Sequence, residues 1–169
     1  CEDAEARRGG GRHTPDEVVV SVGAKHTLFN LALALFEPGD EVIVPAPYWV
    51  SYPEQVRLAG AEPVIAKTAE ADNFCITPEQ LERTLTSNTK ALVLCTPSNP
   101  CGSAYDEAKL RGLLDGVRKH SLWLIVDEIY SRLTYDGFEH VSPLALAPDL
   151  KDRIIVVDGV SKTYAMTGW

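Results

Sequence analysis

The stretch that decides the fold is Ile154-Ile155-Val156-Val157-Asp158, which continues as Gly159-Val160-Ser161-Lys162. A short run of β-branched residues bounded by small residues predicts a buried strand. Ligands of open α/β sheets bind beyond the carboxyl ends of the strands, and this run delivers Lys162 to such a place. A lysine held there can act as the amine of a Schiff base with an aldehyde. A solvated surface lysine is the alternative, and the rest of the chain decides between the two.

Upstream of this stretch, strand-like and helix-like segments alternate. Apolar or β-branched runs predict further strands at residues 17–22, 42–44, 63–67, 91–95 and 122–126. Helical spacing of apolar residues predicts a helix that opens at Gly23 and is stopped by Pro38-Gly39, and further helices at residues 52–58, 78–85 and 106–119. The stretch Thr77-Pro78-Glu79-Gln80 offers an N-cap, a proline at the first helical position and a capping-box partner. Residues 131–150 have the composition of a loop. Such alternation implies right-handed crossovers and a mostly parallel sheet with helices on both faces. The predicted fold class is therefore α/β, in three layers.

The two ends of the chain look abrupt. Residues 1–16 are polar and contain Arg7-Arg8 and several glycines, so we interpret them as a connector from a missing N-terminal segment. Residues 17–169 are interpreted as one domain. Because the chain opens with Cys1 rather than Met and stops at Gly168-Trp169, shortly after Lys162, we expect it to be a fragment.

Composition limits the classes of partner. The chain has 169 residues, 45% of them hydrophobic, which is enough to bury the core of one globular domain. Its formal net charge of -8 argues against nucleic acid or an anionic membrane as partner, since both attract a basic face. No apolar run approaches the roughly 20 residues of a membrane span. An anionic cofactor would therefore have to be held by local dipoles.

The cysteines indicate a reducing compartment. They stand at positions 1, 75, 95 and 101, with no Cys-x-x-Cys pair and no regular framework. A cytoplasmic location is expected, with a plastid as the alternative. No metal site is predicted.

Polar or glycine-bearing groups follow the ends of the predicted strands. They are Gly23-Ala24-Lys25, Tyr48-Trp49, Asn99, Asp127 with Tyr130, and Ser161-Lys162. Because the carboxyl ends of parallel strands meet at one edge of a sheet, we expect these groups to converge there. Each has a structural alternative, such as a turn glycine, a core aromatic ring or a turn-forming asparagine. Asp127 is harder to dismiss, because a carboxylate buried after an apolar strand needs a cation or a protonated ring nitrogen.

The converging groups fit one cofactor. The sequence has no Gly-x-Gly-x-x-Gly and no Walker motif, which weakens dinucleotide and nucleotide interpretations. The helix that begins at Gly23-Ala24-Lys25 offers free N–H groups and a positive dipole end to a phosphate. The same ligand would also need an aldehyde to react with Lys162, a ring nitrogen to face Asp127 and a flat ring to lie against Trp49. That molecule is pyridoxal 5'-phosphate.

From Asp16 to Trp169 the sequence resembles the fold-type-I, class I aminotransferases, and most closely their aspartate/prephenate branch. The motifs that carry the likeness are Val22-Gly23-Ala24-Lys25, the stretch from Asp40 to Trp49, Ser98-Asn99-Pro100-Cys101-Gly102, Asp127-Glu128-Ile129-Tyr130, and Ser161 to Trp169. Found together in this order and at these spacings, they are highly specific. The resemblance implies that residues 17–169 form most of the large, cofactor-binding domain, without the small domain.

The resemblance also implies roles. Lys162 would form the internal aldimine and shuttle the proton of the substrate Cα, while Asp127 would keep the pyridine nitrogen protonated. Asn99 and Tyr130 would hydrogen-bond the phenolic oxygen of the ring, which makes Lys162, Asp127 and Tyr130 the expected catalytic residues. The expected cofactor-binding residues are Gly23, Ala24, Lys25, Trp49, Asn99, Asp127, Tyr130, Ser161 and Lys162.

The implied reaction is transamination of aspartate or glutamate with a 2-oxo acid, in a homodimer. In this branch the lysine that matches Lys25 also meets the distal carboxylate of acidic substrates. The alternatives are another reaction of the same class of cofactor enzyme, as in a lyase or synthase, or a truncated, non-catalytic product that associates with full-length subunits.

Some residues depart from the family pattern. Threonine is common at the position of Cys101, and serine, a phosphate ligand, at that of Gly159. The phosphate-binding arginine that follows Gly168-Trp169 in the family and the arginine for the substrate α-carboxylate both lie outside this chain. We therefore expect the 169 residues alone to be inactive.

Overall fold

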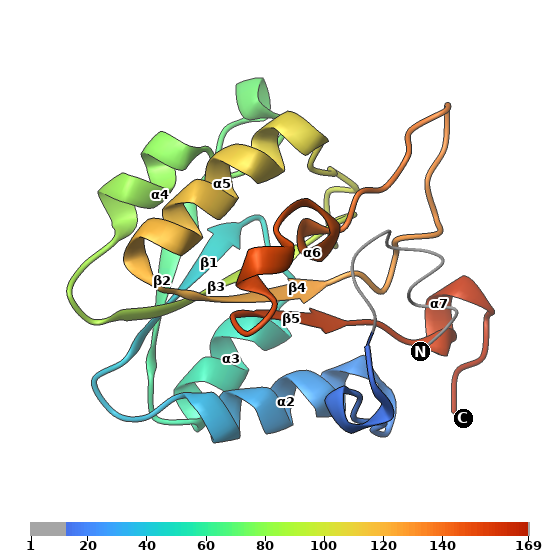
Figure 1. Ribbon diagram of the computed structural model, residues 1–169, viewed down its shortest axis with the longest axis horizontal. Helices are drawn as coiled ribbons and strands as arrows, with labels where there is room; N and C mark the ends of the chain where they lie inside the picture. Colours follow the sequence, from blue (N-terminus) through green and yellow to red (C-terminus); the bar gives the residue numbers. More distant parts are fainter. Residues whose placement is uncertain (1–12, 169) are drawn as a thin grey trace.

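The computed structural model describes residues 13–168, and its centre is a five-stranded parallel sheet (Figure 1). The strands are β1 (Glu41–Ala46), β2 (Glu62–Lys67), β3 (Thr89–Cys95), β4 (Trp123–Asp127) and β5 (Ile154–Val157). Their order in the sheet is β2-β1-β3-β4-β5, and all neighbouring strands are parallel. Parallel neighbours need crossover connections, and a helix separates each pair of consecutive strands. The predicted α/β class is confirmed.

Helices cover both faces of the sheet (Figure 1). On one face lie α2 (Gly23–Leu35) and α3 (Ser51–Leu58), and on the other α4 (Pro78–Thr84), α5 (Glu107–His120) and α6 (Pro143–Leu146). The short α7 (Val160–Thr163) follows β5 beyond the edge of the sheet. Three 3-10 turns complete the described elements: η1 (Pro15–Glu17), η2 (Glu70–Asp72) and η3 (Pro148–Leu150).

Side chains that alternate along β4 reach two separate cores. Leu124 and Val126 belong to the apolar cluster beneath α4, α5 and α6, whereas Ile125 belongs to the cluster beneath α2 and α3. Successive strand residues point to opposite faces, so this alternation sends Asp127 toward the α2 and α3 side and Glu128 toward the α6 side. At the carboxyl edge of the sheet, Asp127 and Glu128 therefore lie in different surroundings.

Side-chain caps begin two helices, and the cap predicted at Thr77 is confirmed. At the start of α4 the Thr77 hydroxyl accepts a hydrogen bond from the Gln80 amide at 3.2 Å, and the Gln80 side chain accepts one from the Thr77 amide at 2.9 Å. Asp106, predicted as the first helical residue, is instead the N-cap of α5, where its carboxylate accepts from the Lys109 amide at 2.9 Å. Side-chain acceptors at these positions satisfy amides that have no partner within the helix.

The strand predicted at residues 17–22 is wrong. Glu17 ends η1, and residues 18–22 belong to no strand, with Val19 and Val20 exposed at 81% and 92%. β-branched composition favours extended backbone, but a strand also needs a hydrogen-bonding neighbour, and none of the described residues pairs with this segment.

The loop predicted at residues 131–150 is only partly correct, because α6 and η3 lie within it. Each begins at a proline, which suits a first helical position, and each is too short to show helical periodicity. Residues 1–12 of the predicted connector and Trp169 lie outside the described residues. In the part of the chain that the structure does describe, no helix combines the length and the apolarity needed to cross a membrane.

Candidate functional site

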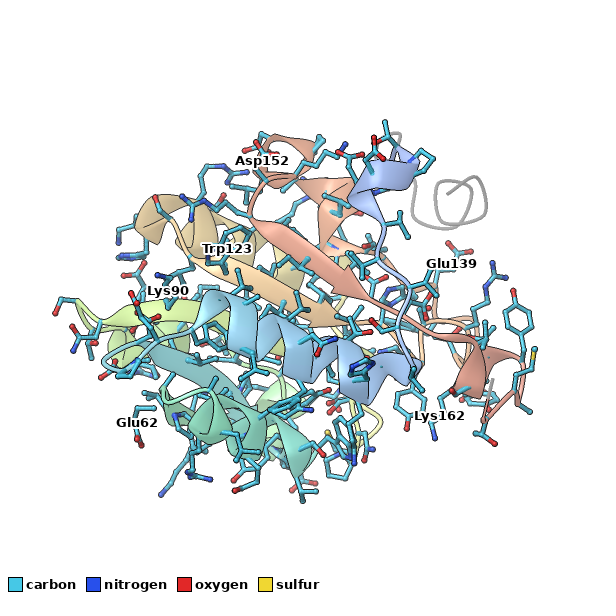
Figure 2. The ribbon with its side chains drawn as sticks, turned by 90° about the horizontal axis from the view of Figure 1, so that it is seen from below. Glu62, Lys90, Trp123, Glu139, Asp152 and Lys162 are labelled. Atoms are coloured by element: carbon cyan, nitrogen blue, oxygen red, sulfur yellow. The ribbon has the colours of Figure 1, made fainter. Side chains whose placement is uncertain are left out.

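A pocket of about 280 Å³ opens at the carboxyl edge of the sheet. It brings together every residue of the predicted cofactor-binding set, from Gly23 at the start of α2 to Lys162 in α7. Figure 2 shows Lys162 at this edge, opposite the edge where β2, β3 and β4 begin near Glu62, Lys90 and Trp123. The parallel sheet brings Trp49, Asn99, Asp127 and Lys162 to this edge, since each lies at or after the carboxyl end of a strand. The expectation that Gly23-Ala24-Lys25 also follows a strand is wrong, because residues 18–22 form none, and these three residues reach the pocket as the first turn of α2.

Asp127 lies on the floor of the pocket. The residue is 3% exposed, and its carboxylate accepts hydrogen bonds from the Tyr52 hydroxyl at 2.7 Å and from the Ile129 amide at 3.1 Å. Burial raises the pKa of Asp127, and the charges of Asp158 and Glu128 raise it further, while the two hydrogen bonds act in the opposite direction. Within residues 13–168, Asp127 has no ion pair with a lysine, arginine or histidine side chain. A cationic group of a ligand would therefore complete its surroundings.

Tyr52 is a pocket residue that the sequence analysis did not select. It is 4% exposed, and burial, together with the neighbouring Asp127 charge, raises the pKa of its hydroxyl. The hydroxyl therefore keeps its proton and acts as the donor to Asp127. Its nearness to Trp49 in the sequence is the signal that could have found it, because a turn at the start of α3, in which the Tyr52 amide donates to the Trp49 carbonyl at 3.1 Å, keeps the two residues together. The two rings meet edge to face, with centroids 5.5 Å apart.

Cys95, Ile129 and Thr167 also line the pocket without having been predicted. Burial raises the pKa of the Cys95 thiol to about 11, and the nearby Asp127 charge adds to this effect. The thiol is therefore neutral near pH 7. Cys101, which departs from the family pattern, does not line the pocket, and its sulfur lies 2.9 Å from the Ser103 hydroxyl.

Two lysines stand at the mouth of the pocket, and both are exposed. The Lys25 ammonium lies 4.8 Å from the centroid of the Trp49 ring, and the Lys162 ammonium 5.9 Å from that of Tyr130. Distances below about 6 Å permit cation–π attraction. The two amines thus flank the opening while the carboxylate lies at its base.

The start of α2 presents backbone donors to the pocket. Gly23 has φ 77, a conformation that favours glycine, and the N-cap residue Val22 makes no side-chain cap hydrogen bond. The first amides of a helix have no partner within it, so those of Ala24 and Lys25 are available to an anion. Gln55 holds the Lys25 carbonyl through a 3.0 Å hydrogen bond from its side-chain amide.

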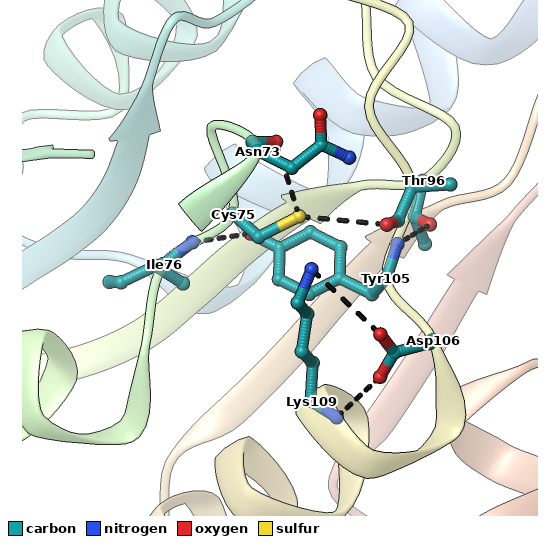
Figure 3. Close-up of polar contacts among 8 residues, drawn as sticks. Asn73, Cys75, Ile76, Thr96, Tyr105, Asp106 and Lys109 are labelled. Atoms are coloured by element: carbon teal, nitrogen blue, oxygen red, sulfur yellow. Dashed lines mark hydrogen bonds and ion pairs between the residues drawn. The ribbon is translucent and has the colours of Figure 1, made fainter. Parts of the chain in front are cut away.

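Asn99 belongs to the loop between β3 and α5, and hydrogen bonds of Thr96 and Tyr105 hold the two ends of this loop together (Figure 3). The Thr96 hydroxyl accepts a hydrogen bond from the Tyr105 amide at 3.3 Å, and the Tyr105 hydroxyl accepts one from the Ile76 amide at 3.0 Å. The Thr96 amide in turn donates to the Asp127 carbonyl at 3.0 Å. Because Thr96 is fully buried, this network fixes the loop relative to β4.

The donor set fits pyridoxal phosphate and gives no sign of a metal. The buried carboxylate suits its ring nitrogen, and the aromatic face suits its ring. The free helix amides suit its phosphate, and the primary amine suits its aldehyde. Residues 13–168 contain no cluster of three or more histidine, cysteine or acidic side chains able to hold a metal ion.

Comparison with known proteins gives matches along the whole chain. Residues 5–169 match the family model of aminotransferases of class I and II. The chain is 49% identical over 164 residues to an aspartate aminotransferase of Geobacillus stearothermophilus, covering 97% of this chain and 42% of that protein. It is 45% identical over 170 residues to an aspartate/prephenate aminotransferase of Cereibacter sphaeroides, covering 100% of this chain and 42% of that protein.

Solved structures agree with the sequence matches. The aspartate aminotransferase of Rhizobium meliloti superposes with a TM-score of 0.96 at 44% identity, covering 99% of this chain and 42% of that one. An aromatic aminotransferase of Pyrococcus horikoshii gives a TM-score of 0.94 at 36% identity, covering 99% of this chain and 44% of that one. The chain therefore spans about two fifths of the length of the relatives that it matches.

Proposed function

The chain belongs to the class I and II aminotransferase family, and from this premise we propose that the protein is a pyridoxal-phosphate-dependent aminotransferase acting on an acidic amino acid and a 2-oxo acid. The observation that carries the proposal is the single pocket in which Asp127, Lys162, Trp49 and the start of α2 meet. Relatives named aspartate aminotransferase support the choice of donor. The direct test is formation of oxaloacetate from aspartate and 2-oxoglutarate by the full-length protein.

The pocket suggests how each residue would hold the cofactor. Lys162 would carry it covalently, the Trp49 ring would lie against its ring, and the Ala24 and Lys25 amides would bind its phosphate. Asn99 and Tyr130 would hydrogen-bond the phenolic oxygen, and Ser161 would add a hydroxyl near the phosphate. When bound, pyridoxal phosphate supplies an electron sink for the charge that develops at the substrate Cα.

The protein's own contribution is proton control. The ionised Asp127 carboxylate would keep a proton on the ring nitrogen, and the buried Tyr52 hydroxyl would favour that ionised form. The Lys162 amine would take the proton from the substrate Cα and deliver it to the C4′ carbon of the cofactor. Residues 17–169 would constitute the cofactor domain, and the remaining parts of a homodimeric protein would supply the groups for the substrate α-carboxylate.

Replacing Tyr52 by phenylalanine should move the acid limb of the kcat/KM profile to higher pH. The lost hydrogen bond stabilises the charged carboxylate, so its removal raises the pKa of Asp127 and protonates it earlier as the pH falls. A hydrogen bond to a charged group contributes about 1.5–3 kcal/mol, which corresponds to about one to two pH units. Tyr135→Phe, at an exposed loop position, is the matched control. An acid limb that stays in place in Tyr52→Phe would show that the bond does not tune Asp127.

Lys25 is proposed to select acidic substrates. Its ammonium stands exposed at the pocket mouth, where it could meet a distal carboxylate. Lys25→Ala should lower kcat/KM for aspartate about 10- to 100-fold more than for alanine, because only the diacid loses a charge-assisted hydrogen bond of about 1.5–3 kcal/mol. Lys25→Arg should recover part of the difference. Equal losses for both donors would mean that Lys25 serves the cofactor phosphate alone.

A further inference from the structure

A second acidic residue directly follows Asp127 and lies on the other face of the sheet. Glu128 is 0% exposed, and the alternation along β4 sends its side chain toward α6. A buried carboxylate is costly to retain, and an apolar residue of similar volume often stabilises a fold equally well. The proposed reaction does not use Glu128 directly, so its burial calls for another explanation.

The Glu128 side chain contacts two residues, His140 and Ser142, at the far end of the loop that follows β4. The Ser142 hydroxyl donates a hydrogen bond to the Glu128 carboxylate at 2.6 Å, and the His140 ring nitrogen Nε2 lies 3.6 Å from the same oxygen. Ser142 is the N-cap residue of α6, yet its side chain makes no cap hydrogen bond. The hydroxyl is thus directed to Glu128 at the expense of the usual capping role.

His140 belongs to the same buried group. Its side chain is 9% exposed, and neither ring nitrogen has a hydrogen-bond partner among residues 13–168. The Glu128 carboxylate lies beside it. A histidine ring placed against a buried carboxylate offers a compensating charge when protonated.

The loop closed by these contacts carries Tyr130 into the pocket. Between Glu128 and Ser142 the described chain contains no helix or strand, and this loop extends away from the sheet (Figure 1). Tyr135, within the loop, is 74% exposed. At its start, the Ser131 amide donates to the Glu128 carbonyl at 2.8 Å and the Leu133 amide to the Tyr130 carbonyl at 2.8 Å. Tyr130 therefore lies on a turn that begins at Glu128.

We propose that Glu128 is a positioning residue: with Ser142 and His140 it forms a clasp that closes the loop of residues 129–141 and thereby holds Tyr130 in the pocket. The clasp joins the end of β4 to the start of α6. Without it the two ends of the loop can separate, and the Tyr130 side chain can adopt more conformations. The inference rests on the proposed function only in that Tyr130 meets the cofactor there.

Hydrogen exchange of the full-length protein without cofactor tests the clasp itself. Ser142→Ala removes the hydroxyl without changing charge and should speed exchange of the Ser131 and Leu133 amides about tenfold, because a charge-assisted hydrogen bond restrains opening. Thr77→Ala, which removes the N-cap of α4 on the same face of the sheet, controls for general destabilisation and should leave these amides unchanged. Exchange that is unchanged in Ser142→Ala, or equally fast in Thr77→Ala, would overturn the proposal.

A spectroscopic titration of the lysine-bound cofactor tests whether the clasp acts through Tyr130. Ser142→Ala should shift the midpoint of this titration by about half a pH unit, and the same substitution in a Tyr130→Phe background should shift it no further. A shift that persists in that background would show that Tyr130 is not the link. If no lysine-bound absorption appears at all, the proposed function fails, whereas the exchange result on the cofactor-free protein still decides the clasp.

Discussion

Lys162→Ala should lower the turnover of transamination by about 10⁴-fold or more. The residue is proposed to supply both the covalent bond to the cofactor and the amine that moves the Cα proton, and a positioned general base alone contributes about 10²- to 10⁴-fold. The structure supports this role because Lys162 lies in α7, the element that follows β5, and lines the same pocket as the buried Asp127. There its ammonium lies 5.9 Å from the centroid of the Tyr130 ring.

The measurement combines kinetics with chemical labelling. Borohydride reduction of the wild-type protein should fix the pyridoxyl group on the peptide containing Lys162, and the Lys162→Ala protein should yield no reduced adduct there. Lys119→Ala, at an exposed lysine of α5 paired with Glu82, is the control and should keep both turnover and labelling. A reduced adduct on Lys25 would contradict the prediction, because Lys25 and not Lys162 would then carry the cofactor.

Asp127→Asn should retain the cofactor but lower turnover by about 10²- to 10³-fold. The amide keeps the volume and one acceptor oxygen, but it carries no charge to hold a proton on the ring nitrogen. Preorganised electrostatic groups of this kind contribute about 10²- to 10³-fold when one is removed. Because Asp127 is 3% exposed, solvent cannot replace the missing charge.

A change of cofactor gives this prediction a test that separates charge from folding. A pyridoxal phosphate methylated at the ring nitrogen carries a fixed positive charge. It should therefore restore part of the turnover of Asp127→Asn, and it should not raise the turnover of the wild type above that with the natural cofactor. Asp115→Asn, at an exposed carboxylate of α5, is the matched control. Full turnover of Asp127→Asn with the natural cofactor would refute the role of the carboxylate.

Much of the fold was readable from local sequence patterns. The apolar runs that became β3, β4 and β5 are buried in a parallel sheet, where strands are apolar on both faces. The capping signal at Thr77 marked the start of α4 because it depends on neighbouring residues alone. The strand predicted at residues 17–22 was wrong, because a strand needs a hydrogen-bonding neighbour and the composition of a segment does not reveal one.

The candidate site was readable to the extent that it follows from strand direction. Trp49, Asn99, Asp127 and Lys162 each lie at or after the end of a strand and gather in one pocket. Gly23 was placed in the same pocket correctly, although the strand expected before it does not form. Tyr52 was missed because its significance lies in a hydrogen bond to a residue 75 positions away.

By itself, the sequence determined an α/β chain whose polar groups follow its strands, because hydrophobic period, turn residues and cap signals act over a few neighbouring residues. Only the tertiary structure decided which side chains touch across the sheet edge. The contacts of Tyr52 with Asp127 and of Ser142 with Glu128 depend on strand order, register and the face to which each residue points. These quantities arise when the two apolar cores form on opposite faces of the sheet, and no local pattern encodes them.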